Sequence, residues 1–246
     1  MDGGIGPASG REVLAEAFAE LVETTIGEFD VHEVLQVLVD RCVDVLDVSA
    51  SGLMLAASDG LQVMVASDSQ AKLLELFQVQ HDEGPCLDSY QSGEAIVATG
   101  SRGELDRWPR FSREFAEAGF NSVIAVPLRV NGRVFGGLNL FGTGEHSAPD
   151  STARIAQAMA KVVAIAIEND RISRERVTLI QQLETALESR VAIERATGIV
   201  AYHLDIGLIE AFVPLRHRAR SSRRLLKVVA VEAINDRAHD FTKDGH

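Results

Sequence analysis

The last quarter of this 246-residue chain contains three short helical patterns in succession. Apolar residues recur at helical spacing, first at Leu183, Leu187, Val191, Ile193, Ala196 and Val200, then at Leu208, Phe212 and Leu215, and finally at Leu225, Val228, Val229 and Ile234. Each pattern gives a helix one apolar stripe to bury. Because three such helices can cover one another's stripes, residues 183–238 are predicted to form a small helical bundle, followed by a tail at 239–246.

Charge sets this bundle apart from the rest of the chain. Six basic residues lie between Glu210 and Glu232 with no acid among them: Arg216, Arg218, Arg220, Arg223, Arg224 and Lys227. Residues 1–182 carry 14 Lys and Arg against 27 Asp and Glu, a net charge of −13, whereas residues 183–238 carry 9 against 7, a net charge of +2. The bundle therefore has a surface suited to a polyanion, and a solvated helix face is the alternative.

The bundle resembles the ANTAR family, an RNA-binding module of bacterial antitermination regulators. The resemblance is carried by the segment SRVAIERATGI, by Ala211-Phe212, Leu215-Arg216 and Ala219-Arg220, and by Leu225 through Ala230. Thr197 stands where this family commonly has Lys. The resemblance implies binding to RNA hairpins, and the residues expected to contact RNA are Arg190, Thr197, Gly198, Arg216, Arg220, Arg223, Arg224 and Lys227.

Three details of the bundle have two interpretations each. Pro214 lies in the second helix and lacks a backbone donor, so it either kinks that helix or delays its start. Ser221-Ser222 is expected to open the third helix with a hydroxyl as N-cap, unless a single helix runs through the basic residues. Gly198 serves either RNA contact or close helix packing.

Helix and strand patterns of a different kind precede the bundle. Residues 1–10 are small and Gly-rich, which is typical of disorder. Helices are expected at 11–27, after Asp30 as N-cap, at 70–79 and at 107–118, and strands at 48–57, 61–66, 95–98, 121–130 and 133–141. Asn131-Gly132 favours a type I′ turn between the last two strands, and Gly136-Gly137 indicates a bulge or a close backbone approach. The predicted fold class is α+β with an antiparallel sheet.

Residues 11–170 resemble a GAF domain, a fold that senses small molecules. The resemblance is carried by Glu83-Gly84-Pro85-Cys86, Arg107-Trp108-Pro109 with Phe111, Gly119-Phe120, and the strand pair SVIAVPLRVNGRVFGGLNLF; the loop at Glu83–Cys86 resembles actinobacterial members. GAF domains bind diverse ligands, so the resemblance names no cofactor. The candidate pocket residues are Cys86, Tyr90, Trp108 and Gly137, although aromatic residues in such a fold are usually core.

One continuous helix is expected from Ser151 to about Ala201, with residues 171–182 as a linker between the two domains. Ile172, Leu179, Ala186 and Ile193 recur every seven residues, which favours a parallel two-chain coiled coil and a homodimer. The alternative is a single amphipathic helix that packs on its own domain. In the coiled coil, Arg190 would belong to the dimer seam rather than to the RNA surface.

Several classes of protein do not fit the sequence. No apolar run is long enough to span a bilayer and the first residues do not resemble a signal peptide, so we expect a cytoplasmic protein. Cys42 and Cys86 imply no disulfide framework, and no His or Cys stands at metal-ligand spacing. No nucleotide-binding or hydrolase motif is present, so no enzyme is expected.

Three hypotheses follow from these patterns. In the first, a GAF domain senses a small ligand or a partner, and a dimeric ANTAR bundle binds hairpins in nascent RNA to control transcription antitermination. In the second, Cys86 serves a GAF-type redox enzyme, although a buried structural thiol fits its acidic neighbours better. In the third, the basic bundle is an adaptor for an acidic protein.

Overall fold

The computed structural model describes residues 10–58, 60–100, 103–144 and 150–236. These residues fall into two compact units, the N-terminal unit up to Arg171 and the C-terminal unit from Ile172 onward. The predicted disorder at residues 1–10 and the tail at 239–246 lie outside the described residues, except that Gly10 already belongs to helix α1 (Gly10–Glu23).

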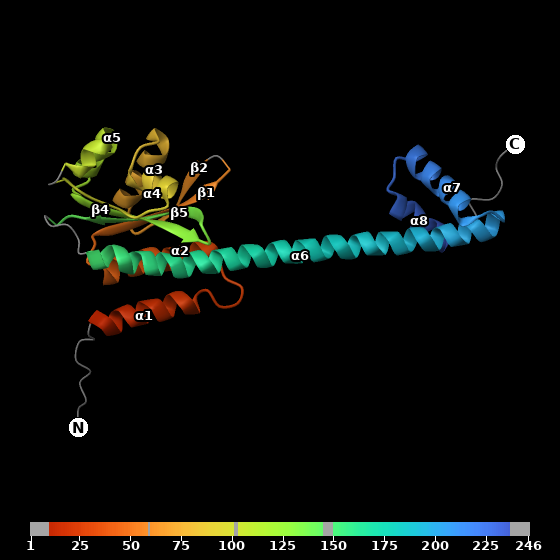
Figure 1. Cartoon of the computed structure of the whole chain (residues 1–246), viewed down its shortest axis with the longest axis horizontal. Coiled ribbons are helices and arrows are strands. Elements are labelled where there is room, and N and C mark those ends of the chain that lie inside the picture. The colour runs from red at the N-terminus through yellow and green to blue at the C-terminus, as the bar shows by residue number, and fades with distance from the viewer. Residues whose placement is uncertain (1–9, 59, 101–102, 145–149, 237–246) are drawn as a thin grey trace, which may run out of the picture. The chain divides into compact units, whose positions relative to one another are not determined.

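A five-stranded antiparallel sheet forms the middle of the N-terminal unit (Figure 1). Its strands are β1 (Ala50–Ala57), β2 (Gly60–Ala66), β3 (Ile96–Thr99), β4 (Ser122–Val130) and β5 (Arg133–Gly142), in the order β2-β1-β5-β4-β3. The two strands with the strongest apolar patterns are β5, which is the central strand, and β4, which lies next to it, and both faces of the sheet are covered there. The predicted α+β class with an antiparallel sheet is confirmed.

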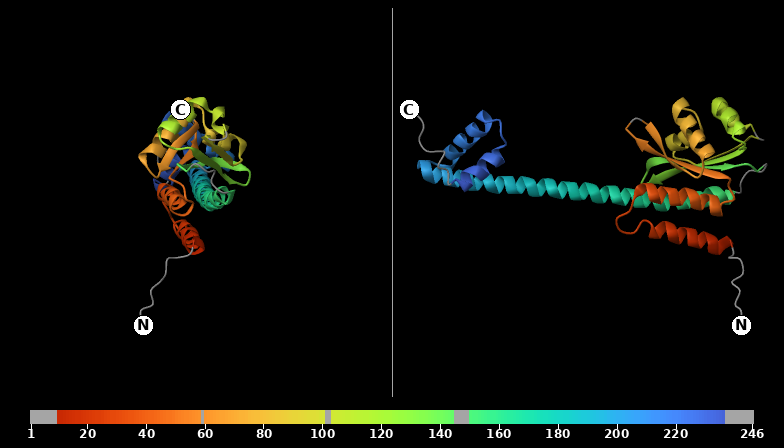
Figure 2. Two further views of the ribbon diagram at one scale, coloured as in Figure 1. Left: turned by 90° about the vertical axis from the view of Figure 1, so that its left-hand side faces the viewer. Right: turned by 180° about the vertical axis from the view of Figure 1, so that it is seen from behind.

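Helices cover both faces of this sheet (Figures 1 and 2). On one face lie α2 (Val31–Val45) and the first turns of the long helix α6 (Asp150–Leu204), with α1 packed outside α2. On the other lie α3 (Ser69–His81), α4 (Pro85–Ser92) and α5 (Pro109–Glu117). Alternation along β5 divides the two cores, because Leu138 and Leu140 join the cluster under α2 and α6, whereas Phe141 joins the aromatic cluster of α5.

Local chemistry explains several element boundaries. Asp30 caps α2, because its carboxylate accepts the His32 N–H at 2.7 Å, as predicted. Asn131 and Gly132 join β4 to β5 with φ values of 52° and 81°, which a type I′ turn requires. The register between β4 and β5 shifts by one residue, because Leu128 pairs with Gly136 whereas Arg129 pairs with Val134. Phe135, the residue before Gly136, is therefore left without a partner in β4. The predicted irregularity in β5 is therefore confirmed.

Helix α4 was not expected from the sequence. Gly84 precedes it with a φ of 151°, and Pro85 occupies its first turn, where a missing backbone N–H costs no hydrogen bond. The helix ends at Gly93 in the left-handed conformation. With only eight residues, it is too short to give a clear helical period in the sequence.

The C-terminal unit contains the rest of α6, then α7 (Leu208–Ser221) and α8 (Leu226–Asn235). These helices bury one small core that consists mainly of alanine: Ala196, Val200, Ala211, Leu215, Ala219, Val229, Ala230 and Ala233. Since α7 begins at Leu208 and contains Pro214, the alternative in which proline delays its start is wrong. The expected seryl N-cap is also wrong, because α8 begins only at Leu226 with Leu225 before it.

Within the described residues, no single helix is both long and apolar enough to cross a membrane. Helices α6 and α7 meet that test only together, as a pair bent by 107°.

Candidate functional site

Five basic residues of the C-terminal unit gather around the connection between α7 and α8. Arg216 and Arg220 lie exposed on α7, Arg223 and Arg224 lie exposed in the connection, and Lys227 lies half-buried in the first turn of α8. We call these five residues the basic junction. The sequence predicted this gathering of cations, but it placed Ser221 and Ser222 at the start of a helix. Instead their hydroxyls donate to the Arg218 carbonyl at 3.1 and 2.6 Å, at the end of α7.

Helix α7 ends in a Schellman motif built on an arginine. The Arg224 N–H donates to the Ala219 carbonyl at 2.9 Å, and the Arg223 N–H donates to the Arg220 carbonyl at 3.2 Å. Arg223 therefore takes the left-handed conformation, with a φ of 53°. Glycine is usual at this position, because a side chain there costs about 1–2 kcal/mol. The chain keeps an exposed cation at a position where it is conformationally unfavourable.

The candidate cations differ in whether they already have a partner. Arg224 forms a bidentate pair with Glu232, Lys227 reaches Glu188 at 3.2 Å, and Arg190 pairs with Glu194 at 2.9 Å. In contrast, the side chains of Arg216, Arg220 and Arg223 make no hydrogen bond or ion pair with any residue that the structure describes. These three arginines are therefore available to an anionic partner without loss of an existing pair.

Thr197 and Gly198 are consecutive residues of α6 and have different surroundings. The Thr197 side chain is buried, and its hydroxyl donates to the Ile193 carbonyl at 2.7 Å, within its own helix. A Cβ atom built on Gly198 would meet nothing within 4 Å, so close packing inside the unit does not require glycine there. Gly198 instead lines an open cavity of about 500 Å³. The basic junction does not include either residue.

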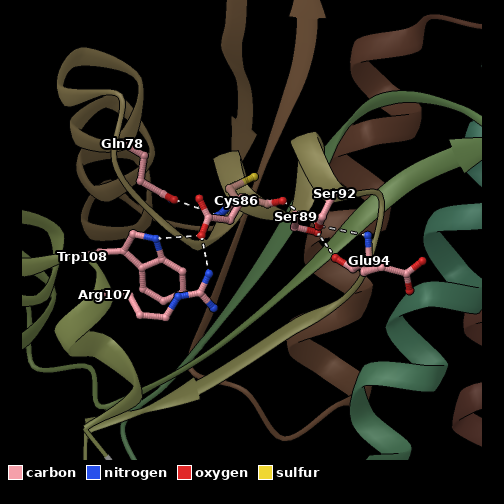
Figure 3. A network of polar contacts seen from close by, with 8 residues as sticks. Gln78, Cys86, Ser89, Ser92, Glu94, Arg107 and Trp108 are labelled. Atoms are coloured by element: carbon pink, nitrogen blue, oxygen red, sulfur yellow. Dashed lines mark hydrogen bonds and ion pairs between the residues drawn. The ribbon is translucent and has the colours of Figure 1, made fainter.

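The N-terminal unit holds a buried polar cluster between its sheet and α3 that the sequence analysis missed. The Asn139 amide on β5 donates to both carboxylate oxygens of Glu75 at 2.8 Å, and Gln78 donates to Glu75 at 3.2 Å. Gln78 in turn accepts the Cys86 N–H at 3.0 Å, a contact shown in Figure 3. Glu75 lies on the buried stripe of α3 between Leu74 and Gln78, and this placement was the signal available in the sequence.

Burial controls the protonation of this cluster. It raises the pKa of Glu75 to about 8, and the hydrogen bond from Asn139 only partly opposes that shift. It also raises the pKa of the Cys86 thiol well above its usual value, and the negative charge of Glu75 acts in the same direction. Burial raises the pKa of Cys42 to about 12. Both thiols are therefore neutral near pH 7, and they lie in different apolar clusters.

The four candidate pocket residues do not form one group. Cys86 is buried against β5, where a Cβ atom on Gly137 would lie 2.5 Å from its sulfur, and Tyr90 packs half-buried on the same cluster. Trp108 belongs to the aromatic cluster of α5, and its indole N–H donates to Asp88 at 3.2 Å. Figure 3 shows Arg107 beside Trp108, and its guanidinium also donates to Asp88, at 2.9 Å. The close approach predicted at Gly136-Gly137 comes from the protein itself.

Comparisons with known proteins agree with this division into two units. The model of the GAF domain matches residues 29–168, and the model of the ANTAR domain matches residues 181–234. No curated protein is similar enough to the chain to count as a match.

Two solved structures are similar to the N-terminal part of the chain in fold. One is the GAF domain of a phosphoenolpyruvate-protein phosphotransferase from Coxiella burnetii, with 15% identity, 68% of this chain and 99% of that chain covered, and a TM-score of 0.53. The other is the free methionine-R-sulfoxide reductase of Neisseria meningitidis in complex with its substrate, with 22% identity, 67% and 91% covered, and a TM-score of 0.50. The chain belongs to the GAF family and carries an ANTAR domain after its GAF domain, a combination that implies an RNA-binding antitermination regulator with a ligand-sensing domain.

Proposed function

We propose that this protein controls transcription antitermination by binding hairpins in nascent RNA through the basic junction. The observation that carries the proposal is the group of three exposed arginines, Arg216, Arg220 and Arg223, without partners among the described residues. Arginine binds phosphates and base edges, and each phosphate contact releases counterions. Arg224 and Lys227 have carboxylate partners and contribute less, because RNA must compete with Glu232 and Glu188.

Binding alone is sufficient for this regulation. A nascent transcript that folds either as an antiterminator or as a terminator shifts towards whichever form the protein binds more tightly. The equilibrium between the two RNA forms shifts by at most the ratio of the protein's affinities for them, so no covalent chemistry is needed. Because the proposed partner is nascent RNA, the protein is proposed to act in the cytoplasm, and the loop at Glu83–Cys86 supports a regulator of the actinobacterial type.

The decisive experiment compares charge removal at the junction with charge removal elsewhere. Bound RNA is first identified by crosslinking in cells and sequencing, and a hairpin from it serves as the probe. The double variant Arg220→Ala, Arg223→Ala is expected to flatten the slope of log affinity against log salt by about one and a half units, since each phosphate contact contributes about 0.7–0.9. The variant Arg110→Ala, Arg113→Ala removes the same charge from exposed sites on α5 and should bind like the wild type.

An unchanged affinity and salt slope in the folded junction variant would contradict RNA binding at this surface. If the protein then retains a partner in cells whose capture survives ribonuclease, the basic junction recognises an acidic protein instead.

We also propose that the protein is a homodimer joined through α6. Leu179 and Leu183 are 55% and 61% exposed in the single chain, although both are apolar. They occupy the two seam rows of the predicted heptad, so a second copy would cover both. Two copies would present two basic junctions, and a transcript with two hairpins would gain affinity from the second contact.

Lysine substitution tests this seam. The variant Leu179→Lys, Leu183→Lys would place charges in the seam and is expected to sediment as a monomer with unchanged helix content. Val177→Lys is the matched control, because Val177 is 54% exposed but lies outside both seam rows. A dimer mass in the double variant would exclude this seam.

In this proposal the GAF domain senses a small ligand or a partner and biases the RNA-binding state. Cys86, Tyr90 and Gly137 lie together but fill their own surroundings, so a ligand there would have to displace packed side chains. A GAF-type redox reaction draws no support from either thiol, because both are buried and protonated.

A further inference from the structure

Tyr202 is the most exposed aromatic side chain that the structure describes in the C-terminal unit, with 85% of its surface accessible. It stands near the end of α6 at one side of an open cavity of about 500 Å³, which is lined by Arg195, Gly198, Ile199, Tyr202, His203 and Ile234. An exposed aromatic ring gains nothing from burial in the folded chain. The exposed ring of Tyr202 is therefore available for a binding partner in the adjoining cavity.

The cavity follows from the helical period of α6. Positions 198 and 199 follow 195 by three and four residues, and 202 follows them by four and three, so the four share one face over the last turns of the helix. Gly198 leaves the middle of this face without a side chain, and a Cβ atom there would meet nothing within 4 Å. Ile199 and Ile234, the latter from α8, supply apolar surface, and no carboxylate lines the cavity.

We propose that this cavity takes an unpaired nucleobase of the bound RNA, stacked on the ring of Tyr202. Single-stranded RNA is commonly held by aromatic rings that stack on splayed-out bases, and every base has a face to stack. Arg195 lies exposed at the cavity and makes no ion pair with another described residue, so its guanidinium reaches the base edge or the adjoining phosphate. The inference rests on the proposed RNA binding and adds the site that recognises a base.

Helix α8 connects this cavity to the basic junction. Arg223 and Arg224 lie three and two residues before the start of α8, and Ile234 lies near its end, eight residues after Leu226. At a rise of 1.5 Å per residue, those eight residues span about 12 Å. That span matches about three or four phosphates of one strand at duplex spacing. One hairpin loop is therefore able to place its phosphates at the junction and one base in the cavity.

The test uses the full chain and the same hairpin probe, with a fluorescent base analogue at each loop position in turn. Tyr202→Ala is expected to weaken binding about tenfold, the range in which removal of one stacking partner falls, and to abolish the fluorescence change at one loop position. The salt slope should stay at the wild-type value, because a stacked base releases no counterions. Tyr202→Phe keeps the ring and should restore both signals.

Gly198→Leu provides a second variant, in which the fold is expected to be retained because an added Cβ meets nothing within 4 Å. It fills the cavity while replacing glycine inside a helix, which raises helix propensity. We expect Gly198→Leu to raise the free energy of unfolding and to weaken RNA binding in the same protein.

The outcomes separate this inference from the function on which it rests. If Tyr202→Ala and Gly198→Leu bind like the wild type while the junction variant loses affinity, the base site is wrong and RNA binding stands. If Tyr202→Ala lowers the salt slope, Tyr202 acts through the arginines and the stacking model is wrong. If the wild type binds no hairpin, both proposals fall.

Discussion

The two units of this chain treat polar groups in opposite ways. The N-terminal unit buries Glu75, Gln78 and Asn139, and the amides of Gln78 and Asn139 donate to the Glu75 carboxyl group inside the fold. The C-terminal unit buries mainly alanine and leaves Arg216, Arg220 and Arg223 of the basic junction without partners among its described residues. Buried polar groups need internal partners, whereas exposed charges pay little for having none. Burial therefore distinguishes a polar group that determines the fold from a charged group that is available for binding.

The largest expected loss of stability is confined to the N-terminal unit. A Cβ atom on Gly136 would lie 2.0 Å from the Met54 carbonyl oxygen, so Gly136→Ala must push β5 away from β1. We expect a loss of about 4 kcal/mol or more, at the extreme of single substitutions. Trp108 is the single tryptophan of the chain and reports this unit by fluorescence. Gly144→Ala is the control, because its added Cβ meets nothing within 4 Å.

Helicity and RNA binding of the C-terminal unit should survive Gly136→Ala. A joint loss of both units would contradict the contrast between them.

The next effect concerns the pH dependence of the buried acid. Because the pKa of Glu75 is raised to about 8, the folded unit holds one proton more than the unfolded chain between the ordinary carboxyl pKa and pH 8. Stability from this group is complete at low pH and falls as pH rises towards 8, by about 1.4 kcal/mol per pH unit. Glu75→Gln should remove that fall in denaturation followed by Trp108 fluorescence, and the exposed control Glu114→Gln should keep it.

The smallest expected change in stability concerns a single residue of the C-terminal unit, Arg223. Arg223→Gly relieves the left-handed backbone conformation and is expected to stabilise the C-terminal unit by about 1 kcal/mol. The same change removes one unpaired cation, so RNA affinity should fall and the salt slope should drop by about 0.7–0.9. Thermal unfolding measures the expected gain in stability, and titration of the hairpin measures the expected loss of affinity and salt slope. A variant that is neither more stable nor weaker in binding would show that Arg223 has no special role.

Patterns with many repeated residues predicted the fold well. The strand pair β4–β5 and its turn follow from alternation and from Asn131-Gly132, and the long helix α6 follows from a sustained apolar period. Helix α4 was missed because it is short and begins with Gly84-Pro85, which reads as a loop. The seryl N-cap was wrong because Ser221 and Ser222 also suit the end of a helix, where their hydroxyls donate to a carbonyl.

The candidate site was only partly accessible to sequence reasoning. Local composition revealed the basic junction, but the sequence does not show that Arg224 and Lys227 have partners at Glu232 and Glu188. The cluster of Glu75 and Asn139 joins residues 64 positions apart, so it depends on strand order, which a pattern of neighbours does not contain. The sequence did not indicate Tyr202 as a site residue, because a tyrosine at helical spacing is equally typical of a core and its exposure is known only from the structure.

The alanine core of the C-terminal unit tolerates few substitutions. A larger side chain at Ala211 or Ala230 would overpack helices that already lie close, and glycine would weaken them, so neither direction of change is neutral. The arginines of the basic junction and Tyr202 lie outside this core. Substitutions at these surface positions are therefore expected to change RNA binding at a smaller cost in stability than substitutions in the alanine core.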